Sequence, residues 1–302
     1  MRPWLLRLHR WTAFAFALPL LAVIASGLVL AVEPALKLAA TPGTVTQEGL
    51  FAVLDKAGPA AERGGLTLRA WQGTVTLGGR GNARSFDLAT AEPAQPSALP
   101  EMFITARRLH ETLLLDLRWL VTASTFAMLA LVAIGLLLGL PRLRNTLLGW
   151  HKVTGWALLP LLVGSPLTGL LMAYHIGVTP PAAAPAEDAV PVREVIRLVA
   201  QKHGLDGLEF IRQMRGGQRL VRVLVPGGSP VTYRVGPEGL QPQPNNWPRL
   251  LHEGYWAGML GSAANLLVAT AMLGLLGTGV VLWARRKYRQ YQTRRRAMAM
   301  AA

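Results

Sequence analysis

The sequence predicts an all-α membrane core of four transmembrane helices, built from a duplicated two-helix unit, with two small α+β domains outside the membrane. Two observations predict this fold. The first is that 51% of the residues are hydrophobic while the formal net charge is +15, so apolar and basic runs must be segregated along the chain. The second is an internal repeat, in which the pattern of residues 107–111 recurs at residues 249–253, an offset of 142.

The repeat extends over most of the chain at this single offset. It pairs His9 with His151, Ser26-Gly27-Leu28 with Thr168-Gly169-Leu170, Gly65-Leu66 with Gly207-Leu208, and His110 with His252. Matched residues at both ends of the unit are difficult to obtain by chance. We therefore expect four of the six histidines to be related by duplication.

Four stretches are long enough to cross a hydrocarbon core, which takes roughly 20 apolar residues. None of them contains an acidic residue, a lysine or an arginine. They are Trp11 to Val32, Trp119 to Leu140, Val153 to Tyr174 and Ala263 to Trp283. A signal peptide is the alternative for the first stretch, but its apolar run is too long for a typical h-region, and we expect it to be retained.

Short basic segments set the expected orientation, because such segments stay in the cytoplasm. They lie before the first span, between the second and third spans, and at the C-terminus. The expected organisation is helix 1–33, periplasmic domain 34–101, helix 102–141 with a periplasmic extension, cytoplasmic turn 142–152, helix 153–175, periplasmic domain 176–247, helix 248–284 with a periplasmic extension, and basic cytoplasmic tail 285–302. The tail is interpreted as a topology anchor at an anionic membrane face rather than a nucleic-acid patch.

The two outer connections have the same predicted order of elements, a helix followed by short strands. In the first, helix 46–57 precedes strands 66–71, 74–77 and 85–88. In the second, helix 191–203 precedes strands 208–214, 219–225 and 231–235. Proline-rich stretches at 93–100, 180–185 and 242–248 are predicted to be linkers.

The paired histidines are the candidate functional residues, because a histidine near a membrane span is costly unless it is paired or liganded. His9 and His151 precede the first and third spans on the predicted cytoplasmic side. His110 and His252 precede the second and fourth spans on the outer side. Leu113, Leu114 and Leu117 continue the helical face of His110, which predicts a helix that projects beyond the bilayer with its histidine turned inward.

Two imidazoles from facing helices are what axial ligation of haem iron requires. The chain has no cysteine, which excludes disulfides, thiolate metal sites and covalently attached c-type haem. Zinc would need three or four clustered ligands, and these histidines are dispersed along the sequence. We therefore expect two bis-histidine haem b groups that transfer electrons, since a six-coordinate iron has no open position for oxygen or substrate.

Several neighbouring residues have two possible roles. Arg10, Arg107 and Arg249 lie beside the histidines and are candidates to neutralise haem propionates, although interfacial snorkelling explains any one of them at least as well. His175 ends the third span and is a reserve outer ligand. His203 is predicted to be a surface residue at a helix end. Prolines 19, 160 and 166 are expected to kink their helices, and the span glycines are expected to permit close packing.

These residues resemble the PepSY-associated transmembrane family, which includes inner-membrane di-haem ferric-siderophore reductases and iron-uptake proteins. The resemblance covers essentially the whole chain and depends on the order and spacing of short motifs at four spans. The motifs are Leu8-His9-Arg10-Trp11 with Ser26-Gly27-Leu28, Leu109-His110-Glu111, Trp150-His151-Lys152 with Gly155 and Thr168-Gly169-Leu170, and Leu251-His252-Glu253. The helix-plus-strands connections resemble PepSY modules.

What the resemblance implies is an inner-membrane oxidoreductase that passes electrons to a periplasmic ferric siderophore and releases ferrous iron. His9 and His151 would hold an inner haem, and His110 and His252 an outer one. No nicotinamide or flavin motif is present, so a quinol or another reductase protein is expected as the electron donor.

Two other classes remain open at the level of sequence. One is a non-enzymatic membrane protein whose PepSY-like connections bind or regulate a periplasmic partner. The other is a small transporter, which the absence of charged residues from the spans disfavours.

Overall fold

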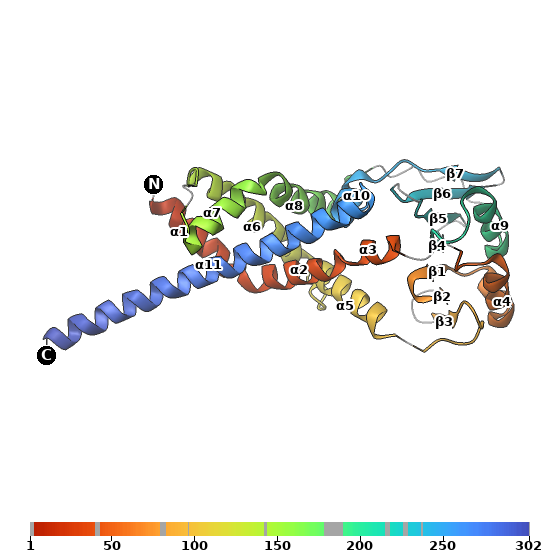
Figure 1. The fold of residues 1–302 in the computed structure, drawn as a ribbon, viewed down its shortest axis with the longest axis horizontal. Coiled ribbons are helices and arrows are strands. Elements are labelled where there is room, and N and C mark those ends of the chain that lie inside the picture. The colour runs from red at the N-terminus through yellow and green to blue at the C-terminus, as the bar shows by residue number, and fades with distance from the viewer. Residues whose placement is uncertain are drawn as a thin grey trace. The chain divides into compact units, whose positions relative to one another are not determined.

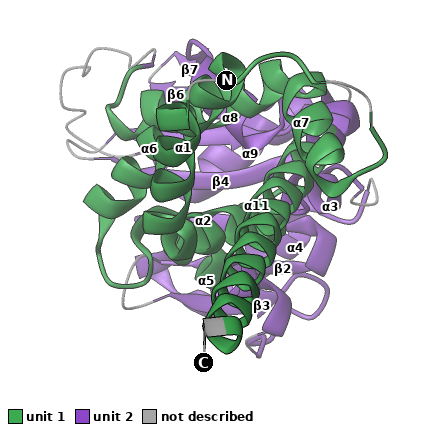
Figure 2. Ribbon diagram, turned by 90° about the vertical axis from the view of Figure 1, so that its left-hand side faces the viewer, with its two compact units in different colours: residues 1–31, 104–176, 264–302 green, residues 32–103, 177–263 purple. Residues whose placement is uncertain are grey.

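The computed structural model describes residues 3–39, 43–78, 83–95, 97–141, 144–177, 190–214, 218–225, 229–236 and 238–301. They divide into two compact units (Figure 2). The membrane unit comprises residues 1–31, 104–176 and 264–302, and the sheet unit comprises residues 32–103 and 177–263. Each unit is described by itself. The predicted linker at 180–185 lies outside the described residues.

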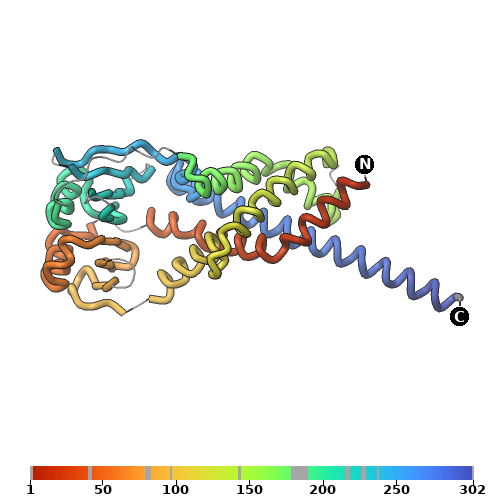
Figure 3. Tube along the Cα trace, turned by 180° about the vertical axis from the view of Figure 1, so that it is seen from behind, coloured from red at the N-terminus to blue at the C-terminus, as the bar shows by residue number. Residues whose placement is uncertain are grey.

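The membrane unit is helical. Its elements are α1 (Pro3–Ala15), α2 (Ala17–Leu30), most of α5 (Ala98–Thr112), α6 (Arg118–Leu137), α7 (Leu147–Ala157), α8 (Leu159–Ala173) and most of α11 (Gly258–Ala301). Three continuous helical stretches are long and apolar enough to cross a membrane, namely Ala17–Leu38, Arg118–Leu137 and Gly258–Met300. The pair α7 and α8, bent by 65°, is a fourth candidate span. In Figure 3, α11 continues as one unbroken helix well past its apolar part.

The duplication is visible in the backbone of the first and third spans. α1 gives way to α2 at Phe16, and α7 gives way to α8 at Leu158, which is the position 142 residues later. Phe16 has φ −103° and ψ 8°, and Leu158 has φ −103° and ψ 15°. Pro19 and Pro160 lie in the first turns of α2 and α8, where a missing N–H costs no helical hydrogen bond. Kinks were predicted at three prolines. The helices break near Pro19 and Pro160, whereas α8 continues through Pro166.

A small apolar core joins these helices. Leu20 and Ile24 of α2 pack with Leu162 of α8 and with Val268 and Met272 of α11. Most of the other apolar side chains of the spans are partly buried or exposed, as expected for helices that face lipid tails rather than water.

The helix that carries His110 does not continue into the second span, so the expected unbroken projection is wrong. α5 ends at Thr112, and α6 begins at Arg118. Between them Leu113, Leu114 and Asp116 adopt positive φ values of 52°, 64° and 54°, which a helix cannot contain. Gly258, the residue 142 positions after Asp116, has φ 53°, so the second copy makes the same turn with a glycine.

The sheet unit contains one antiparallel seven-stranded sheet in the order β3-β2-β1-β4-β5-β6-β7 (Figure 1). Its strands are β1 (Leu66–Arg69), β2 (Thr74–Leu77), β3 (Arg84–Asp87), β4 (Leu208–Gln213), β5 (Arg219–Val223), β6 (Val231–Gly236) and β7 (Gly239–Pro242). Its helices are α3 (Glu33–Leu38), α4 (Gln47–Ala57), α9 (Val192–His203), α10 (Trp247–Glu253) and the 3₁₀ turns Pro59–Glu62 and Ala70–Gln72. β7 was not predicted, and its last residue begins the predicted linker 242–248.

The sequence suggested that the two outer connections form two separate domains, but the structure shows one shared sheet. Their strands join through β1 and β4, where Leu66 pairs with Ile211 and Thr67 with Phe210. Leu66 and Leu208, the first residues of these strands, are repeat-equivalent, so the two copies meet antiparallel about a local two-fold axis, as two subunits of a symmetric dimer do. α4 and α9 cover one face of the sheet and enclose the core (Figure 1).

Candidate functional site

His110 is held against the second helix of the membrane unit. It lies in the last turn of α5, and its Nδ1 is 2.9 Å from the carbonyl oxygen of Val23 and 3.3 Å from Oγ of Ser26 in α2. A side chain at Gly27 would place its Cβ 3.1 Å from Cε1 of His110. The glycine therefore leaves the space that the imidazole fills.

His151 is held in the same manner on another helix. It lies in α7, and its Nδ1 is 2.8 Å from Oγ1 of Thr278 in α11. The next residue, Gly279, would place a Cβ 3.8 Å from Cε1 of His151. A hydroxyl residue followed by glycine thus supports each imidazole, Ser26-Gly27 for His110 and Thr278-Gly279 for His151. We call each of these pairs a hydroxyl-glycine seat.

The contacts of Nδ1 decide the tautomer of His110. The carbonyl oxygen of Val23 only accepts hydrogen bonds, so Nδ1 of His110 carries the hydrogen. At His151 the hydroxyl of Thr278 has contacts with the carbonyl oxygens of Gly274 and Leu275 and can either donate to Nδ1 or accept from it. In a neutral imidazole with a proton on Nδ1, the lone pair is on Nε2, which is the arrangement expected of a histidine that ligates a metal through Nε2.

His9 and His151, the predicted inner pair, both lie in the membrane unit, and their role as haem ligands stays a prediction. His9, in α1, lies near enough to His151 for a charge on one ring to act on the other. Its ring also interacts with the backbone of Leu131 in α6. Nδ1 of His9 is buried and has no hydrogen-bond partner among the described residues. A buried polar atom without a partner is costly, so this position fits a histidine that a bound group completes.

The pairing of His110 with His252 as outer haem ligands stays a prediction. His110 belongs to the membrane unit and His252, in α10, to the sheet unit. His175 is exposed at the end of α8 with φ 56°, and the structure assigns it no ligand role. His203 is not a simple surface residue, because its Nε2 is 2.6 Å from the hydroxyl oxygen of Tyr233, a buried residue of β6.

The arginines named as propionate partners differ in their surroundings. Nε of Arg249 is 3.5 Å from a carboxylate oxygen of Glu253 in the same helix, so its charge is already partly compensated. Arg10 is half-buried, and Arg107 is exposed on α5. That these three arginines neutralise haem propionates stays a prediction.

Sequence reasoning missed a buried ion-pair network in the sheet unit. Lys37 of α3 contacts Glu209 of β4 at 2.9 Å, and Glu209 contacts Arg222 of β5 at 2.9 Å. Arg222 then reaches Glu253, at the end of α10, at 3.3 Å. Burial alone would raise the pKa of the Glu209 carboxyl, but the charges of Lys37 and Arg222 outweigh it and hold the pKa below its ordinary value.

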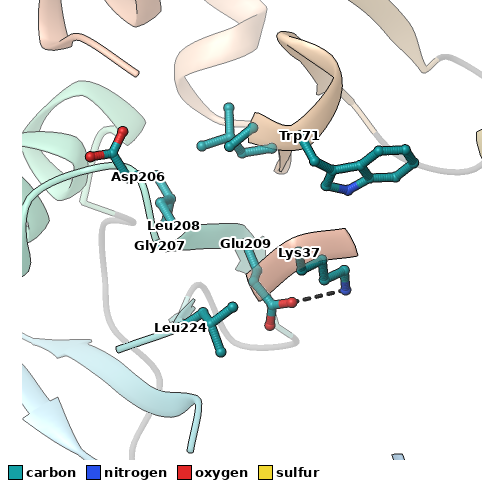
Figure 4. A pocket seen from close by; sticks show the side chains of 9 residues that line it. Lys37, Trp71, Asp206, Gly207, Leu208, Glu209 and Leu224 are labelled. Carbon is teal, nitrogen blue, oxygen red and sulfur yellow. Dashed lines mark hydrogen bonds and ion pairs between the residues drawn. The ribbon is translucent and has the colours of Figure 1, made fainter. Parts of the chain in front are cut away.

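A small pocket lies beside this network (Figure 4). Lys37 and Glu209 line it together with Trp71, whose indole nitrogen is buried without a hydrogen-bond partner among the described residues. The Lys37–Glu209 pair joins residues that are 172 positions apart in sequence, and no local pattern marks it in advance.

The residues of the membrane unit fit a haem better than a bare metal ion. Within the described part of the chain, no group of three or more His, Cys, Asp or Glu side chains is placed to hold a metal ion. Zinc requires such a group. Iron that is already held by a porphyrin needs only axial ligands, and the imidazoles with Nε2 lone pairs can supply them.

Comparison with known proteins agrees with the motifs. The family model described as the PepSY-associated TM region matches residues 6–286, which include all four candidate spans up to the basic tail and the whole sheet unit. No curated protein matches the chain.

Proposed function

The chain belongs to the PepSY-associated transmembrane family, and from this premise we propose that it is a haem b electron-transfer protein that reduces ferric siderophores. It is a membrane protein, and the described residues contain three helices, or four with the bent pair, that are long and apolar enough to span a membrane. The reaction would add one electron to the ferric ion of the chelate and yield ferrous iron, with a quinol or another reductase protein as the source of that electron. Reduction weakens the chelate, because hard oxygen ligands suit the ferric ion.

The observation that carries the proposal is the pair of hydroxyl-glycine seats. At His110 the carbonyl oxygen of Val23 holds the proton on Nδ1 and leaves the lone pair on Nε2, and we infer the same tautomer for His151 beside Thr278. Hydrogen bonds of this kind orient a ligating histidine and raise its basicity. Gly27 also leaves the space at Cε1 of His110 that a side chain would fill, whereas a Cβ at Gly279 would only reach ordinary contact with His151.

The residues of this chain would hold the haem and shield it from water. His9 and His151 would supply axial ligands from α1 and α7, and His110 would supply one from α5. A bound haem would supply reversible one-electron transfer at its iron. The apolar spans around these residues would exclude water, which keeps the local dielectric low and sets the reduction potential.

The test is a reduced-minus-oxidised visible spectrum of the full-length protein in detergent, with haem quantified per chain. His9→Ala and His252→Ala are each expected to remove one low-spin b-type haem or turn it high-spin. His203→Ala is the matched control, because His203 is bonded to Tyr233 within the sheet unit and is not a candidate ligand.

A protein that retains no haem and cannot be reconstituted with it would contradict the proposal. The alternative would then be a membrane protein whose sheet unit binds a periplasmic partner. In that case His9→Ala and His151→Ala would leave function intact, and changes in the sheet unit would abolish it.

A further inference from the structure

Acidic and basic residues are separated along the chain. All 16 acidic residues lie between residues 33 and 253, and residues 117–186 contain none. The three segments predicted to be cytoplasmic, residues 1–10, 142–152 and 285–302, are therefore basic and contain no acidic side chain. Their summed charge attracts anionic partners to this end of the membrane unit.

The last part of α11 has the side-chain pattern of a recognition helix. Four residues recur there at spacings of three and four, so they lie along one face of the helix. The exposed fractions of its two tyrosines are 64% and 58%, and that of its methionine is 66%. Protein interfaces are enriched in tyrosine, methionine and arginine. We call this set the tyrosine stripe, and it consists of Tyr288, Tyr291, Arg295 and Met298.

The unbroken helix holds the stripe away from the membrane surface. α11 is one helix, so its part beyond Trp283 continues along the axis of the span (Figure 3). A rise of about 1.5 Å per residue puts Arg295 about 18 Å beyond Trp283 along that axis. At a tilt of about 20° and with about 6 Å of headgroups, Arg295 stands about 10 Å outside the lipid. This exceeds the Debye length of about 8 Å, so anionic lipid attracts this part of the tail only weakly.

The tail begins beside the predicted inner pair of histidines. The ring of Trp283 stacks on that of Phe14 in α1, with centroids 5.1 Å apart. Arg286 lies near enough to Arg10 for their like charges to interact, and Arg10 directly follows His9. These residues all belong to the membrane unit. A molecule bound along the tail would therefore lie at the end of this unit that holds His9.

The chemistry of the tail favours a protein as its partner. A neutral quinol gains nothing from a cluster of cations, and lipid headgroups do not reach the outer part of the tail. The proposed function requires an electron donor on the predicted cytoplasmic side, and the chain has no nicotinamide or flavin motif of its own. A soluble, acidic electron carrier matches both the charge of the tail and this requirement.

We propose that the tail of α11 is the docking helix for a small soluble electron-carrier protein with an acidic surface, a partner class that rests on the proposed function. The tyrosine stripe would lie in an apolar groove of the carrier, as amphipathic helices do in their partners. Arg294 and Arg296, on either side of the stripe, would pair with carboxylates at the rim of that groove. The reduced carrier would lose one electron, and the haem held by His9 and His151 would gain it.

The test measures binding of labelled, oxidised flavodoxin, a small acidic one-electron carrier, to the full-length protein in nanodiscs of neutral lipid. The oxidised probe cannot donate an electron, so binding is separated from electron transfer. We expect saturable binding that added salt weakens, and no binding of cytochrome c, a basic one-electron carrier. Replacing Arg294→Gln, Arg295→Gln and Arg296→Gln together should weaken flavodoxin binding about tenfold or more.

Two matched controls separate docking from a general effect of charge or helix stability. A triple change in the sheet unit removes the same charge from exposed positions and should bind like the unaltered protein: Arg63→Gln, Arg84→Gln and Arg197→Gln. Within the tail, Tyr291→Ala should weaken binding about fivefold or more, because it removes an aromatic anchor. Gln290→Ala, at the exposed neighbouring position, should not.

Four results would overturn the inference: no binding of flavodoxin, undiminished binding by the triple arginine variant of the tail, equal loss in the sheet-unit control, or equally tight binding of duplex DNA to the tail. A tail variant that loses only binding to anionic vesicles would make the whole tail a lipid anchor and would also overturn it.

Failure of the inference and failure of the proposed function are distinguishable. A haem-free protein that still binds flavodoxin through the tail would retract the reductase and keep the docking helix. A haem protein that a quinol reduces and flavodoxin does not bind would keep the electron-transfer function and lose the docking helix.

Discussion

The hydroxyl of Thr278 contacts the imidazole of His151. Removing this hydroxyl tests directly whether the hydroxyl-glycine seat supports haem binding. Thr278→Val keeps the shape of the side chain but leaves Nδ1 of His151 without its partner at 2.8 Å. We expect haem affinity at the inner site to fall about 10- to 100-fold, the usual effect of losing the partner of a ligating histidine. Haem titration of the purified apoprotein measures this. Thr293→Val is the control, because Thr293 donates only to Arg289 in the exposed part of the same helix.

A substitution at Gly27 tests whether the space beside His110 is needed for haem binding. In Gly27→Ala the new Cβ would lie 3.1 Å from Cε1 of His110, which is tied to Val23 and has little freedom to withdraw. We expect the haem affinity of the site of His110 to fall about tenfold or more, while the haem affinity of the site of His151 stays unchanged. Site-resolved redox titration distinguishes the two. Gly135→Ala in α6 meets nothing within 4 Å and should bind normally; equal loss in both variants would show a general helix effect.

His203 gives the sheet unit a pH dependence. Burial, helped by the charge of Lys202, lowers the pKa of His203 below its ordinary value of 6.5. In the window between the lowered pKa and 6.5 the unfolded chain binds a proton that the folded chain does not, so stability falls as the pH drops through it. Thermal unfolding from pH 7.5 to 5 should show this decline, and His203→Gln should flatten it. An unchanged slope in the variant would assign the decline to other groups.

At the scale of elements, Arg219 joins the two halves of the sheet unit. It is 1% exposed in β5, and its guanidinium donates to the carbonyl oxygens of Gly64 at 2.8 Å, of Glu62 at 2.7 Å, and of Val190. Arg219→Met would leave three carbonyls without this donor, so we expect the unit to lose about 3 kcal/mol or more. Hydrogen exchange of the β4 to β6 amides measures the loss. Arg197→Met, at an exposed position of α9, should change the free energy of unfolding by less than about 0.5 kcal/mol. An effect equal to that of Arg219→Met would reject the role of Arg219.

The sequence predicted the elements better than their ends. The helices α4 and α9 and the strands β1 to β6 were found because their apolar spacing is local, whereas β7 and α10 overlap a stretch that was predicted to be a linker. The break after Thr112 was missed, since Leu113, Leu114 and Asp116 are residues that rarely adopt positive φ, and only the glycine at 258 in the second copy marks the turn. The hydroxyl-glycine seats were visible only as small residues, because spacing does not show which imidazole a serine or threonine meets.

At the scale of the whole molecule, the repeat predicted the duplication but not the way its copies combine. Two connections with their own helix and strands suggested two domains. Each half, however, contributes a sheet of only a few strands, which buries little apolar surface alone. Joining β1 to β4 makes one core that contains Leu66, Ile211 and Val221 from both copies. Pairing between strands some 140 residues apart depends on no local signal, so it could not be inferred from the sequence.

This shared sheet also constrains the membrane topology. Because both connections contribute strands to it, they must lie on the same side of the membrane, and residues 104–176 must cross an even number of times. We therefore propose that α6 is one crossing and that the bent pair α7 and α8 is the other, which predicts a broken span rather than a re-entrant loop. The chain has no cysteine, which makes single introduced cysteines unambiguous reporters.

We therefore expect exposed Ala89→Cys and Gln201→Cys, one in each connection, to react with an impermeant maleimide from the periplasmic side of spheroplasts. Exposed Arg144→Cys and Thr293→Cys should react only after the membrane is opened, because the positive-inside rule places the turn before α7 and the basic end of α11 in the cytoplasm. Labelling of Arg144→Cys from the same side as Ala89→Cys would mean that neither α6 nor the pair α7 and α8 crosses the membrane. The seat of His151 would then lie on the periplasmic side, and the protein could not carry electrons across the membrane through His9 and His151.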